Sequence, residues 1–303
     1  MIGSPVRIGV DFGGTKIEAA AIDAGGAVRA RIREPNPGDY GGAVETVARL
    51  VAEVERRTAP VGVVGVGMPG SASPRTGLIR NANSVWLNGR PFRDDLERRL
   101  QRPVRIANDA DCLALSEASD GAAAGAGVVF AAILGTGCGG GVVVGGRLLQ
   151  GANGIAGEWG HTPLPWPGAD ETPPLPCWCG RSGCLETYIS GTGLERDYAG
   201  QGPSLHGPEI VAAARAGEPR AAAALDRYID RLGRGLAVIC DLIDPEVIVL
   251  GGGMSNVDEI YARTPHVIRR HVFSDGWEAR LVPALHGDSS GVRGAAWLWP
   301  LEP

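Results

Sequence analysis

The apolar positions of the chain fall into short strand-like runs that alternate with longer stretches of helical period. The segment "VRIGVDFGGTKIEAAAID" predicts a strand from Arg7 to Asp11, a glycine turn from Phe12 to Lys16 and a second strand from Ile17 to Ile22. In "GGAVETVARLVAEVERRT" the apolar residues recur at helical spacing, which predicts a helix. Strands that alternate with helices are typical of an α/β architecture.

The same alternation continues toward the C-terminus. We expect a strand in "VGVVGVGMPG", a short helix in "PFRDDLERRLQ", a strand in "VRIAND" and a helix in "DCLALSEA". Further on, residues 208–243 predict two helices broken near Gly217 to Pro219, "PEVIVLGGGMSN" a strand that meets a glycine turn, and "SSGVRGAAWLW" a closing helix. The segment "HTPLPWPGADETPPLPC" is too rich in proline for a helix or a central strand.

One hairpin pattern occurs twice. The segment "VVFAAILGTGCGGGVVVGG" repeats the order of apolar strand, glycine turn (Gly135 to Gly139) and apolar strand. This repetition predicts that the chain consists of two related halves, each starting with such a hairpin. Small residues from Gly121 to Gly127 indicate the boundary between them.

Composition and charge exclude several classes of protein. The 303 residues are 44% apolar and 21% charged, with a net charge of −5 and no block of basic residues, so nucleic acid is not an expected partner. No secretory leader and no apolar run of about 20 residues is visible, so we expect a cytoplasmic protein without a membrane partner. In a reducing compartment, clustered cysteines favour metal or redox roles over structural disulfides.

Three glycine loops each follow an apolar strand: "DFGGTK", "LGTGCGGG" and "VLGGGMSN". Backbone N–H groups in such a loop can surround a phosphate, Thr15 and Lys16 add a hydroxyl and a cation, and Asp11 could orient Mg²⁺. A single loop of this kind could equally be an ordinary hairpin turn. Three of them together favour a nucleoside triphosphate, and we interpret Cys138 as a small packing residue.

Asn108 and Asp109 end a predicted strand and precede a predicted helix. Asn and Asp commonly cap helices, and from this segment alone the cap is the favoured interpretation. The functional alternative is that Asp109 is a general base for a substrate hydroxyl, with Asn108 as a neighbouring hydrogen-bond donor.

The segments "GEWGH" and "CWCGRSGC" together contain four side chains with metal-ligand chemistry. They are His161, Cys177, Cys179 and Cys184. One imidazole and three thiolates suit tetrahedral Zn²⁺, and Gly180 and Gly183 permit a tight knuckle turn. Because the four protein ligands would complete the coordination shell, the site would be structural. The alternative is a disulfide between Cys177 and Cys184.

The chain resembles the bacterial ROK-family sugar kinases over essentially its whole length. The motifs "DFGGTK", "GVGMPG", "ANDAD", "GTGCGGG", "GEWGH", "CWCGRSGC" and "VIVLGGGMSN" occur in the order of that family. The segments "NANSVWLNGRPF", "AGEWGHTPLPW" and "HGDSSGVRGAAWLWP" are most similar to the bacterial fructokinase that is also called manno(fructo)kinase. The resemblance to N-acetylglucosamine kinases is weaker in "NANSVWLNG" and around the proline-rich segment.

This resemblance implies an α/β fold like that of actin and hexokinase, in which two ribonuclease-H-like domains are duplicated and close over an interdomain cleft. The first domain would span residues 1–118 and the second, with the zinc knuckle, residues 119–289. A C-terminal helix at about 290–303 would pack back on the first domain. The family also implies a homodimer.

The resemblance assigns roles to single residues. Asp109 is expected to be the catalytic base, and the expected sugar-binding residues are Asn83, Asn108, Glu158, His161 and Glu186. The expected ATP-binding residues are Asp11, Gly13, Gly14, Thr15, Lys16, Gly135, Thr136, Gly137, Cys138, Gly139, Gly140, Gly251, Gly252 and Gly253. His161 and the three cysteines of the knuckle would bind structural Zn²⁺. Asp111 departs from the family, where many members have Asn, but Asp109 is unaffected.

The expected activity is ATP- and Mg²⁺-dependent phosphorylation of a hexose, D-fructose to D-fructose 6-phosphate, with mannose as a further substrate. Alternatives within the family are kinases of N-acetylglucosamine or N-acetylmannosamine, and glucokinase. A sugar-sensing ROK protein without catalysis is the non-enzyme alternative. ROK repressors carry a helix-turn-helix before the first glycine loop, whereas only ten residues precede Asp11 here.

The knuckle also suggests why Glu186 follows it. Glu186 lies two residues after Cys184, and Glu158 lies three residues before His161. One metal ion would therefore hold two sugar-binding carboxylates from separate segments, and we hypothesise that zinc preorganises the sugar site.

Overall fold

A computed structural model describes residues 6–58, 63–200 and 202–300 of the chain, which form two compact units. Unit 1 contains the described residues up to Gly125, those of Gly141–Ala156 and those from Leu285 onward. Unit 2 contains Ala126–Gly140 and the described residues of Gly157–Ala284. The start of the strand expected in "VGVVGVGMPG", at 61–62, and the end of the expected C-terminal helix, at 301–303, lie outside the described residues.

Unit 1 is built on a five-stranded sheet with the order β3-β2-β1-β4-β7. Its strands are β1 (Val6–Phe12), β2 (Lys16–Asp23), β3 (Val28–Pro35), β4 (Val64–Met68) and β7 (Val104–Asn108). The predicted hairpin is confirmed, because β1 and β2 pair antiparallel in a register that places Asp11 opposite Glu18. Strands β4 and β7 continue the sheet in parallel with β1, so the carboxyl ends of these three strands share one edge.

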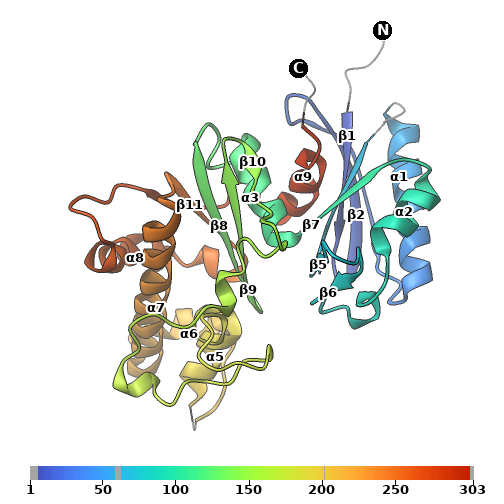
Figure 1. Cartoon of the computed structure of the whole chain (residues 1–303). Helices are drawn as coiled ribbons and strands as arrows, with labels where there is room; N and C mark the ends of the chain where they lie inside the picture. Colours follow the sequence, from blue (N-terminus) through green and yellow to red (C-terminus); the bar gives the residue numbers. More distant parts are fainter. Residues whose placement is uncertain (1–5, 59–62, 201, 301–303) are drawn as a thin grey trace. The chain divides into compact units, whose positions relative to one another are not determined.

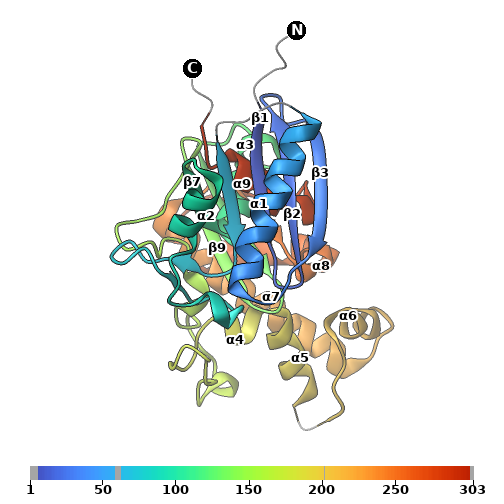
Figure 2. The ribbon, with the colours of Figure 1, turned by 90° about the vertical axis from the view of Figure 1, so that its right-hand side faces the viewer.

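Helices cover both faces of this sheet (Figures 1 and 2). The helices are α1 (Tyr40–Arg57), α2 (Phe92–Leu100), α3 (Asp109–Asp120) and α9 (Ser290–Trp297). The predicted helix α1 begins where the Asp39 carboxylate accepts the N–H of Gly42, and it packs with α2 on one face. Helix α9 packs on the opposite face beside α3. The unit is completed by β5 (Ser71–Ala72), β6 (Ile79–Arg80), η1 (Val85–Leu87) and η5 (Gly287–Ser289).

Helix α9 lies directly on the backbone of the sheet. A Cβ atom at Gly9 of β1 would lie 1.9 Å from the carbonyl oxygen of Val292, and one at Gly65 of β4 would lie 1.8 Å from that of Ala295. Any side chain at either position would therefore displace the helix. The two glycines explain how a short helix can pack tightly on the strands that lead to the shared edge.

A second five-stranded sheet has the order β10-β9-β8-β11-β12. Its strands are β8 (Val128–Leu134), β9 (Cys138–Val144), β10 (Arg147–Leu148), β11 (Val247–Gly251) and β12 (Arg280–Pro283). If the five strands of each sheet are numbered as they occur along the chain, both sheets have the same spatial order: third, second, first, fourth, fifth. The predicted duplication of the starting hairpin is thus confirmed at the level of topology.

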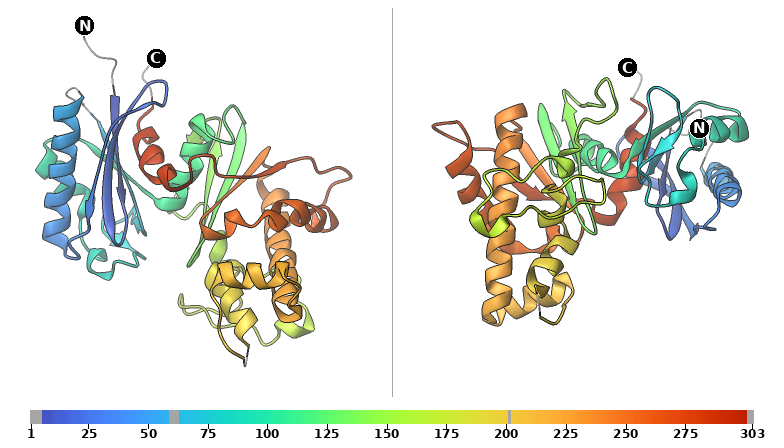
Figure 3. Two further views of the ribbon diagram at one scale, coloured as in Figure 1. Left: turned by 180° about the vertical axis from the view of Figure 1, so that it is seen from behind. Right: turned by 60° about the horizontal axis from the view of Figure 1, so that its bottom comes forward.

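Helices of unit 2 gather around its longest helix, α7 (Figure 3). The α-helices of this unit are α4 (Glu186–Ile189), α5 (Gly191–Ala199), α6 (Gly207–Arg215), α7 (Pro219–Ile243) and α8 (Asp258–His271). Its short 3-10 helices are η2 (Trp159–His161), η3 (Ala169–Glu171) and η4 (Gly253–Asn256). The predicted break near Gly217 to Pro219 separates α6 from α7. Among the described residues, no helix combines the length and the apolar character that a membrane-spanning segment needs.

A buried carboxylate fixes two loops of unit 1. The side chain of Glu117, on α3, is fully buried and accepts the N–H groups of Ala122 at 2.8 Å, Leu285 at 2.9 Å and His286 at 3.0 Å, and the hydroxyl of Ser290 at 3.1 Å. Ala122 lies just before the chain first leaves unit 1, after Gly125, and Leu285 is where it returns for the last time. One carboxylate therefore satisfies the backbone at both places.

We predict that Glu117→Ala lowers the free energy of unfolding by about 3–5 kcal/mol, because it leaves several buried donors without an acceptor. Glu117→Gln retains one acceptor oxygen and should cost less. Urea denaturation measures both, with Glu278→Ala at an exposed carboxylate as the control, for which we expect a change within about 0.5 kcal/mol. Equal effects of Glu117→Ala and Glu278→Ala would contradict the prediction.

Candidate active site

The shared edge of the first sheet carries Asp11, Asn108 and Asp109. Asp11 lies at the end of β1, Asn108 ends β7, and Asp109 is the first residue of α3. Asn108 is the N-cap of α3, since its side chain accepts the N–H of Ala110 at 2.9 Å, and its Nδ2 donates to the carbonyl of Gly70 at 3.1 Å. The predicted cap is therefore present. It leaves the Asp109 side chain exposed at the helix start, where a base could be reached.

The glycine turn between β1 and β2 is held by a residue that sequence reasoning missed. Within the turn, the N–H of Gly13 donates to the carbonyl of Lys16 at 2.9 Å. Asn36 donates from Nδ2 to the carbonyl of Gly13 at 2.8 Å and from its backbone N–H to that of Thr15 at 3.0 Å. Only the neighbouring "NPG" turn signal in the sequence hinted at Asn36. The exposed residues Gly14 and Thr15 thus belong to a turn of fixed shape.

Lys16 is the only lysine in the chain, and every other basic side chain except histidine is arginine. This feature of the composition, which no motif shows, singles out an ammonium group at the first glycine turn. A lysine ammonium is a compact point charge with three donors, whereas arginine presents a planar fork.

The loop that bears Asn83 lies beside this turn. A Cβ atom at Gly14 would be 4.0 Å from the hydroxyl of Ser84, and Asn88 braces the loop by two hydrogen bonds to the backbone of Ala82. Asn83 itself is exposed. Unit 1 therefore brings the first glycine turn and the Asn83 loop together.

Asp11 is held in an environment that disfavours its charge. Burial raises its pKa to about 6, and the negative charges of Glu18 and Asp109 add to this effect. A Cβ atom at Gly291, in the first turn of α9, would lie 2.9 Å from the Asp11 carboxyl carbon, so this glycine leaves room for the carboxylate. A carboxylate beside two like charges suits a divalent cation, which would restore the ionised form.

In unit 2, residues of the second and third glycine loops line one pocket of about 530 Å³. Gly135 and Thr136 form one part of its wall. Gly253 and residues that come directly after it in the chain form another part. The remaining walls were not foreseen and come mainly from the starts of α5 and α6, with Gly191, Thr192, Gly207, Pro208 and Val211. Two helix N-termini beside glycine loops are suited to an anionic ligand. The sequence signal was the further run "SGTG" at residues 190–193.

The three glycines that we expected to contact the adenosine differ in their position relative to the pocket. Gly251 ends β11 and is buried, and Gly252 has φ +80°, with space for a Cβ atom blocked by the backbone of Leu134. Only Gly253 lines the pocket. Of the second loop, Gly137, Cys138, Gly139 and Gly140 also lie outside the pocket lining.

Cys138 is a packing residue whose backbone serves the site. Burial raises the pKa of its thiol well above the ordinary value, and the nearby Glu186 charge raises it further, so the thiol stays protonated. Its backbone N–H donates to Oε2 of Glu186 at 3.0 Å. The second glycine loop and the start of α4 are thereby joined.

The "GEWGH" segment packs on this same loop. A Cβ atom at Gly160 would lie 2.1 Å from the carbonyl oxygen of Cys138, and Nε1 of Trp159 donates to the carbonyl of Gly139 at 3.1 Å. The segment forms the single turn η2, with Glu158 exposed at its start and His161 at its end. Unit 2 therefore brings Glu158, His161 and Glu186 around one loop.

His161 and three cysteines form a metal-type cluster. The ligand atoms of His161, Cys177, Cys179 and Cys184 all lie within 4.8 Å of one another. The Sγ of Cys177 is 3.7 Å from Nδ1 of His161, and the sulfur atoms of Cys179 and Cys184 are 3.6 Å apart. Tetrahedral zinc with its usual bond lengths places ligand atoms about 3.5–3.8 Å apart, which these two distances match.

No disulfide joins the cysteines of the cluster, and their surroundings shift the pKa of Cys184 and Cys179 in opposite directions. All six cysteines of the chain are free thiols. Burial and the neighbouring thiols raise the pKa of Cys184 to about 12, whereas a hydrogen bond from the backbone of Arg181 lowers the pKa of Cys179. Gly180 and Gly183 have φ values of +87° and +79°, as the predicted knuckle turn requires.

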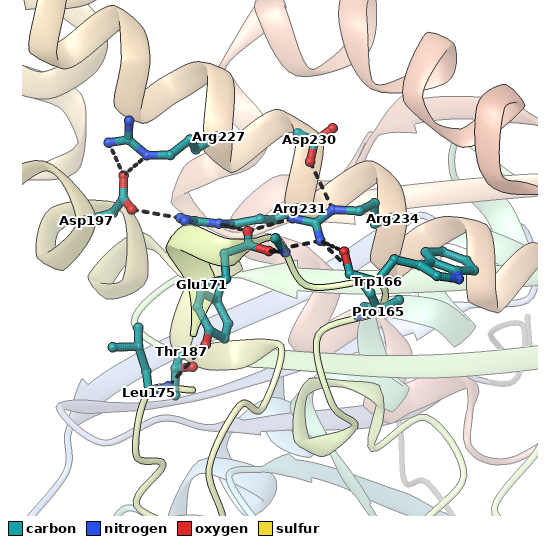
Figure 4. Close-up of polar contacts among 12 residues, drawn as sticks. Pro165, Trp166, Glu171, Leu175, Thr187, Asp197, Arg227, Asp230, Arg231 and Arg234 are labelled. Carbon is teal, nitrogen blue, oxygen red and sulfur yellow. Dashed lines mark hydrogen bonds and ion pairs between the residues drawn. The ribbon is translucent and has the colours of Figure 1, made fainter. Parts of the chain in front are cut away.

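A buried ion-pair network anchors the proline-rich segment that precedes the cysteines (Figure 4). Glu171 accepts hydrogen bonds from Arg231 at 2.7 Å and from Arg234 at 2.6 Å, both on α7, and all three side chains are buried. Burial alone would raise the pKa of Glu171, but the two guanidinium groups outweigh it and lower the pKa to about 2. Arg231 continues the network to Asp197 at 2.8 Å. The segment is thus tied to α7 independently of any metal.

Comparisons with known proteins agree over the whole chain. The sequence model of the ROK family matches residues 7–302. An N-acetyl-D-glucosamine kinase of Pectobacterium atrosepticum is 42% identical over 296 residues, covering 96% of this chain and 97% of that protein. The crystal structure of a ROK hexokinase from Thermus thermophilus has a TM-score of 0.86 at 36% identity and covers 97% of both chains. A ROK family glucokinase from Streptomyces griseus, solved with glucose and AMPPNP, has a TM-score of 0.77 at 30% identity, covering 96% of this chain and 98% of that one.

The raised pKa of Asp11 predicts a pH-dependent stability. In the unfolded chain the carboxyl group has a pKa of 3.8 and in the folded protein about 6, so its favourable contribution is complete below pH 3.8 and is lost as the pH rises through 6. Asp11→Asn should therefore gain stability relative to wild type by about 2 kcal/mol between pH 4.5 and 7.5.

Urea denaturation at the two pH values, without divalent cations, measures this difference. Asp275→Asn at an exposed carboxylate serves as the control and should show no such trend. A pH-independent difference between Asp11→Asn and wild type would contradict the assigned pKa.

Proposed function

The chain belongs to the ROK family of sugar kinases, and on this basis we propose that it transfers the γ-phosphoryl group of ATP to N-acetylglucosamine, forming the 6-phosphate. The observation that carries the proposal is the 42% identity to an N-acetyl-D-glucosamine kinase across 96% of the chain. The actin- and hexokinase-like α/β fold, with its repeated sheet order, supports the same reaction class.

This proposal revises the expected substrate. The motif resemblance favoured D-fructose and fructokinase, but relatives that match the whole chain are N-acetylglucosamine kinases from several bacteria. The loop segments that suggested fructokinase are short, whereas the identity to these relatives extends over about 296 residues. Fructose, mannose and glucose remain the competing acceptors.

Asp109 is the proposed general base. It accepts the proton of the attacking sugar hydroxyl, whose oxygen forms a bond to the γ-phosphorus while the bond from phosphorus to the β–γ bridging oxygen breaks and ADP leaves. Its exposed position at the start of α3 and the hydrogen bonds that fix Asn108 beside it support this role. The remaining proposed sugar-binding residues are Asn83, Asn108, Glu158, His161 and Glu186.

The phosphates are proposed to be bound by the glycine turns. Gly13 to Lys16 would contact them from unit 1, and Gly135 and Thr136, which line the pocket of unit 2, would do so from the second loop. Mg²⁺, when bound with ATP, supplies charge that neutralises the phosphate oxygens, and Asp11 is the residue proposed to orient it. The like charges around Asp11 support this assignment.

Zinc is the metal ion that we propose His161 and the three cysteines bind, in a structural role. Four protein ligands leave no open position on a tetrahedral ion, so this metal takes no part in the transfer. Its effect would be to fix His161 and the residues that follow Cys184.

The test is a panel of hexoses with ATP, in which ADP release gives kcat/KM for N-acetylglucosamine, fructose, mannose and glucose. We expect N-acetylglucosamine to exceed fructose by about tenfold or more, because a site with hydrogen-bond partners for the acetamido group leaves them unpaired with other sugars. If fructose is the best acceptor, the assignment as a fructokinase is the correct one. If none of the sugars is phosphorylated, the result favours a sugar-sensing protein without catalysis.

Asp109→Asn is the matched control, since it keeps the size of the side chain and removes the base. Turnover should fall by about 10²–10⁴-fold with unchanged thermal unfolding. Near-wild-type turnover in a folded variant would show that another group takes the proton.

A further inference from the structure

We propose that Trp178 is a positioning residue of the sugar site, which holds the Glu186 carboxylate through its indole N–H and thereby links the cysteine loop (residues 177–184) to the second glycine loop. The role of Glu186 in binding sugar is that of the proposed function. The inference adds a residue that neither the motifs nor the comparisons single out.

The key contact is a short hydrogen bond between side chains. Nε1 of Trp178 donates to Oε1 of Glu186 at 2.6 Å, while the other oxygen, Oε2, accepts the backbone N–H of Cys138 at 3.0 Å. The carboxylate is therefore held at both oxygens. Hydrogen bonds to an ionised group are stronger than neutral ones and fix its orientation.

Burial does not explain the position of this tryptophan. Trp178 is 69% exposed, and its ring contacts His161 edge to face at a centroid distance of 5.1 Å. An indole with this exposure gains little from the hydrophobic effect. Its directed N–H group is the feature that the structure uses.

The neighbours of Trp178 along the chain make it a rigid donor. Cys177 and Cys179 flank it and both belong to the metal-type cluster, so a bound ion would fix the backbone on either side. The proposed sequence of contacts runs from the cluster through Trp178 and Glu186 to the Cys138 amide. In this way a structural site influences a carboxylate without touching it.

The test is Trp178→Phe, which keeps an aromatic ring and removes the donor. With N-acetylglucosamine we expect KM to rise about tenfold, in line with the loss of a hydrogen bond to a charged group. The value of kcat should change less than about twofold and the KM for ATP should stay the same, because a positioning residue acts on sugar binding and not on the transfer. The zinc content should equal that of wild type.

A second readout needs no substrate. Hydrogen exchange of the peptide that contains Cys138 should be faster in Trp178→Phe, because Glu186 then holds the Cys138 amide less firmly. This measurement decides the inference even if the wild type phosphorylates none of the sugars, so its failure and that of the proposed function can be told apart.

Trp166→Phe is the matched control. Trp166 lies in the proline-rich segment before the cysteine loop, is 53% exposed and stacks on His271 at 5.0 Å. Its replacement should change neither the sugar KM nor the exchange of the Cys138 peptide. For Trp178→Phe, unchanged exchange and unchanged sugar KM would overturn the inference, and so would a loss of zinc and kcat with an unchanged sugar KM, which indicates a structural role.

Discussion

The candidate site of unit 2 depends on one carboxylate that is held from two sides. Glu186 accepts the N–H of Cys138 from the second glycine loop and the indole N–H of Trp178 from the cysteine loop. Gly160 and Trp159 pack the "GEWGH" turn onto the same loop. The positions of Glu158, His161 and Glu186 are therefore not independent, and a metal ion on the cysteine cluster would constrain all three.

Two buried carboxylates of this protein have hydrogen-bond or ion-pair partners, whereas Asp11 lies beside like charges. Glu117 is satisfied by four donors, and the pKa of Glu171 is lowered to about 2 by two guanidinium groups. Asp11, by contrast, lies near Glu18 and Asp109, and its pKa is raised to about 6. A carboxylate that the fold leaves short of positive charge is suited to a cation that arrives with a ligand.

Sequence patterns predicted the elements that carry a continuous apolar run, a helical period or a glycine and proline signal. The hairpin of β1 and β2, helix α1 and the break between α6 and α7 are present as expected. Strand β3 was missed although "VRARIREP" alternates small or apolar residues with arginine, because none of its residues is buried and no continuous apolar run marks it. Likewise the bracing by Asn36, the α5 and α6 walls of the pocket and the bond from Trp178 to Glu186 join residues that are distant or unpatterned in sequence, so no local period reveals them.

The most direct test of the central claim, that the metal cluster organises the sugar carboxylates, is calorimetric titration of N-acetylglucosamine into metal-depleted protein. The chelated protein, with metal loss verified by elemental analysis and an intact fold by circular dichroism, should bind the sugar about tenfold more weakly or worse, and one equivalent of Zn²⁺ should restore the affinity. Unchanged sugar affinity in protein that has lost its metal would contradict the account.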